Sequence, residues 1–486
     1  STRCHFCSNE CLRTFVDIHA PAQDSSRFIL ATCEKGEVED EGRMREIRSA
    51  TDDMRRKNPD LSAYAARAAF QIPSPPAIDP RLPRWPLTAG MRARRNLVQR
   101  RATLRIGMPR VLNFYSVAPL FTAYFRSLGI AAKNLVFSSH TTEELYAAGG
   151  KRGSVDPCFP SKVAIPHVHN LIAVAHATSP LHVIFFPMLD CLDSPLRGTP
   201  ASRACPTVTA TPAAVKAAFA RERDEFHDHG IRFVDTFLNL SQPALLERQM
   251  YADWAPILGL SPRENRLAVE AGYRHLAQFQ SKLRQRGKDV LASLEREGRL
   301  GIVLLGRPYH NDPGLHHGIP EELQKLGYPI LTQDALPMDS ETLNRLFGAE
   351  VRAGLLPDPL SVTDVWKNAY SENTSRKVWA AKFTARHPNL VALEISSFKC
   401  GHDAPVYSLI EQILEASATP YFSFKDIDEN KPAGAMRLRL ETMHYFLTRY
   451  QEDLNSAAPQ RSSPVRLEWS LHAAPKIDVP LAALQA

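Results

Sequence analysis

Three cysteines of the chain stand in settings that suit a metal–thiolate site. Cys158 lies between two prolines just ahead of a helix-like run, Cys205 is followed by proline, and Cys400 is followed by glycine. Each comes after an apolar, strand-like run and before a helix-like one. A helix N-terminus favours the thiolate, which is the form that binds metals. Three thiolates from the ends of different strands predict a metal site, and a [4Fe–4S] cluster is the central expectation.

A second group of cysteines stands near the N-terminus and consists of Cys4, Cys7, Cys11 and Cys33. Two short strand-like runs, residues 14–18 and 27–30, lie between the third and the fourth. Four thiols around a hairpin predict a small module that holds zinc or a second [4Fe–4S] cluster, because each takes four Cys ligands. The spacing matches neither common ferredoxin pattern, so the metal stays open.

A histidine-rich turn follows the strand-like run at residues 301–305. His310 and His317 in this turn could donate a proton or support the cluster, and they could equally be ordinary loop histidines. Arg307 could bind an anion or pair with a carboxylate. Cys191 is a weaker candidate ligand, because no Pro or Gly flanks it directly.

Several reaction classes have no motif in the chain. There is no G-x-x-x-x-G-K-[ST] loop, no G-x-G-x-x-G after a strand, and no G-x-S-x-G elbow. Eight cysteines without a secretory signal favour a reducing compartment and metal or redox chemistry over disulfides. No apolar run approaches the length of a membrane span. We therefore expect a cytoplasmic protein that does not enter a membrane.

Length and charge set broader limits. A chain of 486 residues suggests two or three domains. The net charge of +7 comes mostly from the basic run 81–110, which predicts a solvated linker or helix face, or contact with an anion such as coenzyme A. Nucleic acid is not an expected partner. The chain begins with Ser1 rather than Met, which suggests part of a longer protein.

Strand-like and helix-like runs alternate in two stretches, which predicts parallel sheets covered by helices. The expected fold class is α/β, with two Rossmann- or flavodoxin-like lobes, a Cys-rich N-terminal module and a helical connection. The expected boundaries are 1–40 for the Cys4 module, 41–103 for a charged Pro-rich linker, 104–240 for the first lobe, 241–300 for the helical connection, 301–455 for the second lobe and 456–486 for a mobile tail. Ligands of such sheets bind beyond the carboxyl ends of the strands.

Helices are expected at residues 61–70, 117–128, 161–177, 212–227, 243–254, 262–297, 320–326, 375–383, 404–416 and 433–450. Pro166 should kink the third of these. The helix at 262–297 is very long, so a break is expected near Gly272 or Gly287.

Several segments together resemble the acyl-CoA dehydratase activase-related proteins, also described as CoA-substrate-specific enzyme activases. The matching segments are 106–112 (IGMPRVL), 156–162 (DPCFPSK), 204–209 (ACPTVT), 306–310 (GRPYH), 317–319 (HGI), 397–401 (SFKCG) and 428–430 (DEN). The resemblance implies an oxygen-sensitive iron–sulfur protein related to the subunits of 2-hydroxyacyl-CoA dehydratases. It also implies Cys158, Cys205 and Cys400 as the cluster ligands.

Long members of that family carry ATPase modules of the actin/hexokinase type, which drive a low-potential electron to a dehydratase cluster. This chain lacks the ATPase motifs, so the resemblance implies an ATPase activase module or subunit as its partner. The expected function is to accept or relay electrons through the cluster, with acyl-CoA as a further ligand. The alternatives are a lyase that dehydrates a 2-hydroxyacyl-CoA itself and a zinc-stabilised scaffold. A dimer is left open.

Overall fold

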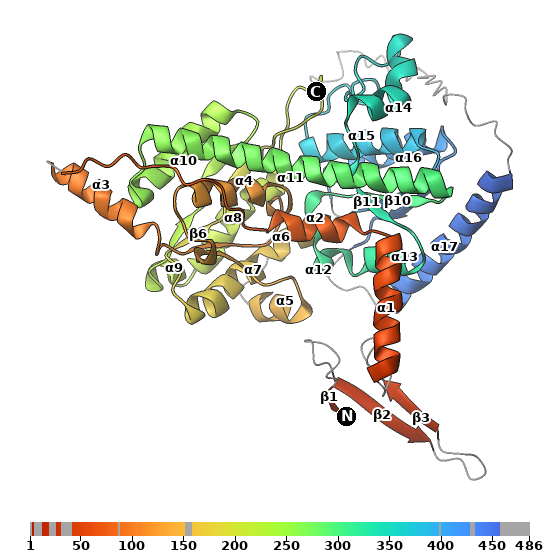
Figure 1. Ribbon diagram of the computed structural model, residues 1–486, viewed down its shortest axis with the longest axis horizontal. Coiled ribbons are helices and arrows are strands. Elements are labelled where there is room, and N and C mark those ends of the chain that lie inside the picture. Colours follow the sequence, from red (N-terminus) through yellow and green to blue (C-terminus); the bar gives the residue numbers. More distant parts are fainter. Residues whose placement is uncertain are drawn as a thin grey trace, which may run out of the picture.

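The computed structural model describes residues 2–3, 12–18, 26–30, 41–85, 88–150, 158–397, 400–427 and 433–456. Two regions within them each hold a four-stranded parallel sheet with helices around it (Figure 1). The prediction of an α/β chain with parallel sheets is confirmed. In these ranges no helix has both the length and the apolar character needed to cross a bilayer.

The sheet of the first lobe joins its strands in the order β5-β4-β6-β8. Their bounds are Leu135–Phe137 for β5, Ile106–Met108 for β4, Val183–Phe185 for β6 and Arg232–Val234 for β8. Ile106 pairs with Leu135 on one side and Val183 on the other, so β4 is a central strand. Every residue of β4 and β6 is buried, which is typical of a strand covered by helices on both faces.

The sheet of the second lobe joins its strands in the order β11-β10-β12-β13. Their bounds are Ile330–Thr332 for β11, Gly301–Leu305 for β10, Leu390–Ile395 for β12 and Tyr421–Phe424 for β13. In both lobes the first strand lies between the second and the third, as in flavodoxin-like sheets. The strand order therefore reverses between β4 and β6 and between β10 and β12, where such sheets bind ligands.

Helices connect the strands in both lobes. The first lobe has α4 (Phe114–Ser127), α5 (Glu143–Gly149), α6 (Phe159–Lys162), α7 (Ala164–Asn170), α8 (Pro206–Phe219) and α9 (Glu225–Asp228). Next come α10 (Pro243–Leu258) and α11 (Pro262–Glu297), which lead to the second lobe. The second lobe has α12 (Pro313–His316), α13 (Ile319–Lys325), α14 (Ser340–Arg352), α15 (Glu372–Arg386), α16 (Tyr407–Glu415) and α17 (Ala433–Ser456).

Two of the helix predictions for the first lobe are wrong in detail. The helix expected from residue 212 begins earlier, because Pro206 occupies its first position. The expected kink at Pro166 is displaced, since the break between α6 and α7 falls at Val163. Pro166 lies in the first turn of α7, where its missing N–H costs no hydrogen bond.

A two-stranded parallel sheet extends the first lobe beyond β6 and β8. It consists of β7 (Met188–Cys191) and β9 (Phe237–Asn239). The amide N–H of Met188 donates to the Thr236 carbonyl at 2.9 Å, which continues the ladder past Pro187. This extension was not predicted, and it places Cys191 at the end of a strand.

Near the N-terminus, β1 (Thr2–Arg3), β2 (Leu12–Ile18) and β3 (Ser26–Leu30) form an antiparallel sheet. The two predicted strands of this region are confirmed. The cysteines of the predicted metal module, Cys4, Cys7, Cys11 and Cys33, lie outside the described residues, as do the segment 428–430 and the predicted tail from residue 457. The N-terminal metal module therefore stays a prediction.

The segment expected to be a linker contains three helices, α1 (Glu41–Lys57), α2 (Leu61–Ala69) and α3 (Ala89–Arg100). Only α2 was predicted. Its side chains enter the cores of both lobes: Leu61 packs in the second lobe, and Ala69 packs in the first. Arg101, in the basic run expected to be solvated, is buried and pairs with Glu264 at 2.8 Å. Parts of this segment are thus built into the fold.

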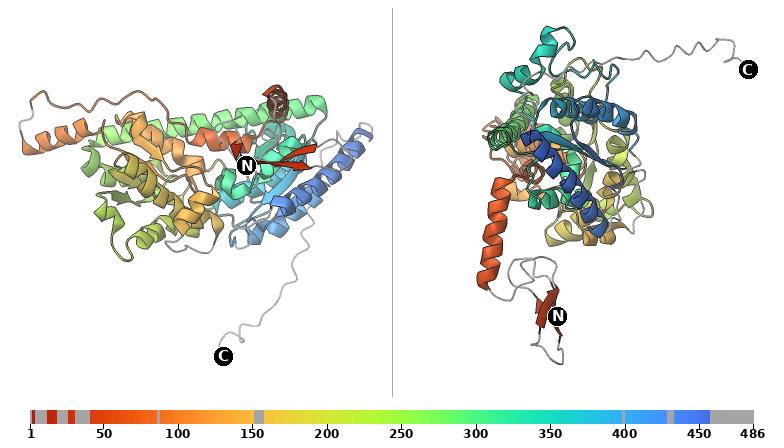
Figure 2. Two further views of the ribbon diagram at one scale, coloured as in Figure 1. Left: turned by 90° about the horizontal axis from the view of Figure 1, so that it is seen from below. Right: turned by 90° about the vertical axis from the view of Figure 1, so that its right-hand side faces the viewer.

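α11 is a single uninterrupted helix of 36 residues, and the expected break is wrong. Figures 1 and 2 show it running along both lobes. Ser261 and Glu264 form a capping box at its start. Its two glycines let neighbours approach closely: a Cβ on Gly272 would lie 2.8 Å from the Leu120 carbonyl oxygen, and one on Gly287 would lie 1.8 Å from that of Ala335.

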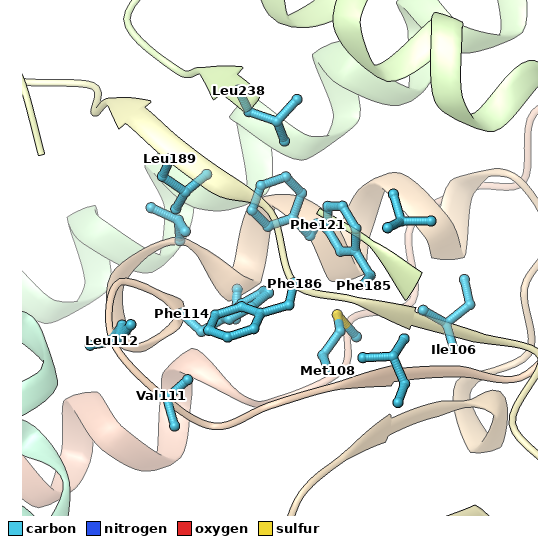
Figure 3. Packing of buried hydrophobic residues seen from close by; sticks show 14 of the residues in the cluster. Ile106, Met108, Val111, Leu112, Phe114, Phe121, Phe185, Phe186, Leu189 and Leu238 are labelled. Carbon is cyan, nitrogen blue, oxygen red and sulfur yellow. The ribbon is translucent and has the colours of Figure 1, made fainter. Parts of the chain in front are cut away.

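The core of the first lobe combines aromatic side chains of α4 with residues of the strands (Figure 3). The ring centroids of Phe121 and Phe185 lie 5.0 Å apart, and those of Phe125 and Trp254 lie 4.5 Å apart, both edge to face. Such pairs contribute about 0.5–1.5 kcal/mol beyond the area they bury. This packing fixes β6 against α4 and α10, and so positions the loops that follow the strands.

Candidate functional site

The three cysteines singled out from the sequence lie in loops that precede helices. Cys158 is the residue before α6, and Cys205 is the residue before α8. Cys400 lies between β12 and α16, where its amide N–H donates to the Ser397 carbonyl at 3.0 Å. All three are partly buried, and none forms a disulfide in the described part of the chain.

All three thiols act electrostatically on one buried turn. This turn follows β10 and includes Arg307 and Tyr309. Burial raises the pKa of Tyr309 well above its usual value, Arg307 opposes this rise, and Cys205, Cys400 and Cys158 each add to it. Cys158 and Cys205 also act on each other. Two cysteines of the first lobe and one of the second thus lie near enough to Tyr309 for their charges to act on its phenol.

The Arg307 guanidinium is buried in this group with part of its hydrogen-bonding capacity unused. Its Nη2 donates to Asp403 Oδ1 at 2.7 Å and to Thr374 Oγ1 at 2.9 Å. Its Nε and Nη1 have no partner among the described residues. Burial lowers the pKa of Arg307, but the Asp403 carboxylate raises it well above its usual value. A charged arginine with two unpaired buried donors is suited to an anionic partner.

Asp403 connects Arg307 to a second buried cation. It accepts from Lys377 Nζ at 2.8 Å and from Ser396 Oγ at 2.7 Å, and Lys377 Nζ also donates to Glu394 Oε1 at 3.1 Å. Burial raises the pKa of Asp403, but Arg307 and Lys377 hold it well below its usual range. Two cations therefore balance two carboxylates, which is the condition for keeping such charges away from water.

Burial also sets the protonation of two thiols. It raises the pKa of Cys158, against hydrogen bonds with Ser161 that lower it. It likewise raises the pKa of Cys400, against the charge of Arg307. At Cys158, burial therefore opposes the thiolate that the helix start is expected to favour. A metal would have to displace these protons.

Within the ranges that the structure describes, no three His, Cys, Asp or Glu side chains lie close enough together to hold one metal ion. The gathered thiols therefore do not form a single-ion site such as zinc requires. In an iron–sulfur cluster, several iron and sulfide atoms stand between the cysteine sulfurs, so its ligands lie further apart. The donor chemistry fits that group: three thiols beside an arginine with two unpaired N–H groups.

The two predicted histidines have structural contacts in the same region. His310 Nδ1 accepts from the Arg307 amide N–H at 3.0 Å, and burial lowers its pKa to about 3. His310 is therefore neutral and supports the turn that carries Arg307. The His317 ring stacks on Phe159, with centroids 6.1 Å apart, and so contacts the residue that follows Cys158.

Cys191 lies in a different setting. Its thiol donates to Asp190 Oδ2 at 3.5 Å, and Arg203 pairs with the same carboxylate. Cys191 is not among the main charges that act on Tyr309. Its exclusion from the ligand set stays a prediction.

A narrow pocket with a cavity volume of about 40 Å³ lies between the lobes next to the Arg307 turn. Helices α4, α11 and α15 form its walls, and Pro308 and Asn311 lie on its edge. Arg376 donates to Asp334 Oδ1 at 2.9 Å and pairs with Glu372 within the lining. The pocket therefore combines apolar walls with fixed charges, as sites for small molecules do.

Residues 105–336 match a family model described as the CoA enzyme activase uncharacterised domain. The match covers slightly under half of the chain. The resemblance to acyl-CoA dehydratase activase-related proteins is thereby confirmed for the region that contains Cys158, Cys205 and Arg307. Cys400 lies beyond the CoA enzyme activase domain. No curated protein matches the chain.

Two central residues of the site also lie beyond the CoA enzyme activase domain and were not predicted. Asp403 stands three residues after Cys400 in the Cys-Gly-His-Asp sequence, and this proximity was an available signal. Lys377 lies within a predicted helix as an ordinary lysine. Only the packing of α15 against β12 shows that it is buried.

Proposed function

We propose that this chain is the iron–sulfur component of an acyl-CoA dehydratase activase system. In this proposal, Cys158, Cys205 and Cys400 hold a [4Fe–4S] cluster between the lobes, through which the chain accepts or relays low-potential electrons. One observation carries the proposal: three thiols from separate loops gather around the buried turn of Arg307, whose Nε and Nη1 have no partner among the described residues. The family of residues 105–336 supports an activase-related role.

The residues around the thiols suit such a group. When bound, a [4Fe–4S] cluster supplies one-electron transfer, and three cysteine ligands leave one iron open to a small ligand. Arg307 would favour the thiolate form of the ligands, since its charge lowers the pKa of Cys158 and of Cys400 against the effect of burial. Its Nε and Nη1 would donate to sulfur, and such hydrogen bonds tune the reduction potential. Lys377 and Asp403 would hold the guanidinium in place.

The electron would come from a separate ATPase module of the actin/hexokinase type, the partner that the resemblance to activase-related proteins implies. The N-terminal cysteines would hold a second [4Fe–4S] cluster or zinc, with Cys4, Cys7, Cys11 and Cys33 as the ligands. Acyl-CoA belongs to the same proposal as a ligand of the partner or of this chain.

The test is to measure iron, sulfide and zinc in protein purified without oxygen, together with an EPR spectrum after reduction. We expect the variant Cys158→Ala/Cys205→Ala/Cys400→Ala to lose the iron and sulfide of one cluster and its EPR signal. Cys191→Ala is the matched control, since this thiol also lies in the first lobe but outside the group. It should retain the metal content of the wild type.

Metal bound at the N-terminal cysteines has to be distinguished from metal bound at Cys158, Cys205 and Cys400. The measurement is therefore repeated in a background variant in which Cys4, Cys7, Cys11 and Cys33 are all replaced by alanine. The proposal fails if that background holds no iron after reconstitution, or if the triple variant in it keeps the same iron. A circular dichroism spectrum matching the wild type would show that each variant is folded.

A second function is direct dehydration of a 2-hydroxyacyl-CoA, for which the pocket beside the Arg307 turn is the candidate place of entry. The relay and the lyase are distinguished by chemically reducing the isolated chain once and then adding an acyl-CoA. Repeated dehydration of an acyl-CoA by the isolated chain would favour the lyase. Delivery of one electron per cluster to an acceptor, without dehydration, would favour the relay.

A further inference from the structure

A cavity of about 180 Å³, open to solvent, lies where the end of α1 meets the C-terminal half of α11. A cavity needs roughly 10–15 Å³ to hold one water molecule, so this one has room for a ligand of many atoms. Its lining contains no cysteine and no residue of the Arg307 turn. The charged residues of the lining are four cations and one acid: Arg56, Lys57, Arg286, Arg299 and Asp289. The cavity therefore carries an excess of positive charge.

Little of this positive charge is neutralised nearby. Lys57 and Arg286 form no ion pair with a described residue. Arg56 pairs with Asp53 at the surface, where water screens such pairs and leaves them weak. The acid of the lining, Asp289, accepts from the uncharged Gln285 Nε2 at 2.9 Å. An anion that enters the cavity would therefore meet cations that are not already occupied by carboxylates.

The cations come from separate elements. Arg56 and Lys57 stand in the last turn of α1, where cations are common because they complement the helix dipole. Arg286 lies in the middle of the second half of α11, and Arg299 follows that helix. The helix dipole does not account for these two, so the fold itself brings the four charges to one cavity.

Both arginines that line the cavity are held in place by neighbours that are mostly uncharged. The Arg286 guanidinium lies over the Tyr64 ring, 4.2 Å from its centroid. Arg299 Nη2 donates to the Gly327 carbonyl at 2.9 Å, and its Nη1 pairs with Glu297 at 3.0 Å. A guanidinium that is already positioned loses less side-chain entropy when it binds an anion.

The base of the cavity is apolar. Three of its side chains, Leu61, Val290 and Leu294, are buried in the core of the second lobe, and Pro59 and Pro329 lie beside them. Charged side chains at the open edge and apolar side chains at the base suit a ligand with an anionic group and an apolar part.

We propose that this cavity binds a small organic phosphate, with its phosphate on Lys57, Arg286 and Arg299 and its apolar part on Leu61 and Val290. A phosphate monoester carries about two negative charges near pH 7, which suits several cations. Guanidinium groups also match the geometry of phosphate oxygens. The proposal is independent of the cluster, since no thiol takes part.

The test is a calorimetric titration of the full chain with inorganic phosphate, phenyl phosphate, AMP and adenosine in turn. We expect saturable binding of phenyl phosphate or AMP, at least about fivefold tighter than that of inorganic phosphate, because the ring covers the apolar base. Adenosine should not bind, because it has no anionic group.

Variants of the lining test the place of binding. Lys57→Ala/Arg286→Ala removes the two unpaired cations and should weaken binding at least about tenfold. Asp289→Asn removes the acid and should tighten binding, because it repels the phosphate. These two effects have opposite signs, so loss of folding cannot produce both. Lys282→Ala is the matched control, since Lys282 is an exposed cation one turn before Arg286 and does not line the cavity. It should leave the affinity unchanged.

The proposal is overturned if neither ester shows saturable binding, or if inorganic phosphate or adenosine binds as tightly as the esters do. It is equally overturned if Lys57→Ala/Arg286→Ala and Asp289→Asn bind as the wild type does. The variant without Cys158, Cys205 and Cys400 should bind the esters normally, so loss of the cluster and loss of this site are separate results.

Discussion

Lys377 is the residue on which the charge balance beside the thiols depends. Its Nζ contacts both Asp403 and Glu394, and all three side chains are fully buried. Burial lowers the pKa of Lys377, but the two carboxylates raise it above its usual value, so the amine is charged. Without this amine, Arg307 would be the single cation facing two carboxylates.

Replacing Lys377 with methionine should therefore lower the free energy of unfolding by about 3–5 kcal/mol, the cost of leaving a buried charge uncompensated. Urea unfolding at pH 7 measures it. Lys288→Met is the control, because Lys288 contacts Asp339 and Glu341 at the surface. Its unfolding midpoint should stay at the wild-type value. Equal changes in the free energy of unfolding of Lys377→Met and Lys288→Met would mean that the buried Lys377 amine is not charged.

At the scale of the elements, α11 depends on glycine where a neighbouring backbone touches it. Replacing Gly287 with alanine should destabilise the protein by about 3 kcal/mol, because the new Cβ would overlap the Ala335 carbonyl. Alanine is nevertheless the better helix former. The same change at Gly90 in α3 meets no atom closer than 4.0 Å and should stabilise by up to about 1 kcal/mol. Urea unfolding of both variants checks this, and stabilisation in both cases would contradict the contact.

The sequence was sufficient for the elements whose apolar pattern is complete in itself, such as β10, β12 and α2. It was not sufficient for α1, where only Met44, Ile47 and Met54 mark one face among many charged residues, or for the continuity of α11. A glycine in a helix can mark a break or a close approach, and only the neighbour decides between them. α14 was a missed signal, because Asp339 caps it and Leu343 and Phe347 lie one turn apart.

At the scale of the whole molecule, buried polar contacts join the lobes. The Thr141 hydroxyl donates to Asp312 and contacts His167 Nε2 at 2.9 Å, and Tyr115 bonds to the same carboxylate. Burial raises the pKa of Asp312 to about 6, against hydrogen bonds from Thr141 and Gly314. The interface between the lobes is therefore sensitive to pH.

The unfolded chain releases the Asp312 proton near pH 4, whereas the folded chain holds it to about pH 6. This contribution to stability is complete below pH 4 and is lost as the pH rises to 6. Relative to Asp312→Asn, the wild type should lose roughly 2–3 kcal/mol between pH 4 and 7, as measured by urea unfolding. Asp339→Asn should show the opposite trend, because hydrogen bonds from Lys288 outweigh burial and lower the pKa of Asp339. A difference between wild type and Asp312→Asn that does not change with pH would contradict the prediction.

The candidate site, like the fold, could be predicted only in part from the sequence. The cysteines and the Arg307 turn stand out locally, because each occurs beside Pro or Gly at the end of a strand. Lys377 gains its role from residues far away in the chain. Nothing in its immediate sequence shows that it is buried between Asp403 and Glu394.

The unbroken α11 has a mechanical consequence. At 1.5 Å per residue, its 36 residues form a helix about 54 Å long, which contributes side chains to the cores of both lobes. Because both lobes pack on this one helix, it opposes their moving apart. An electron carrier gains from such stiffness, because little atomic rearrangement then accompanies each change of charge.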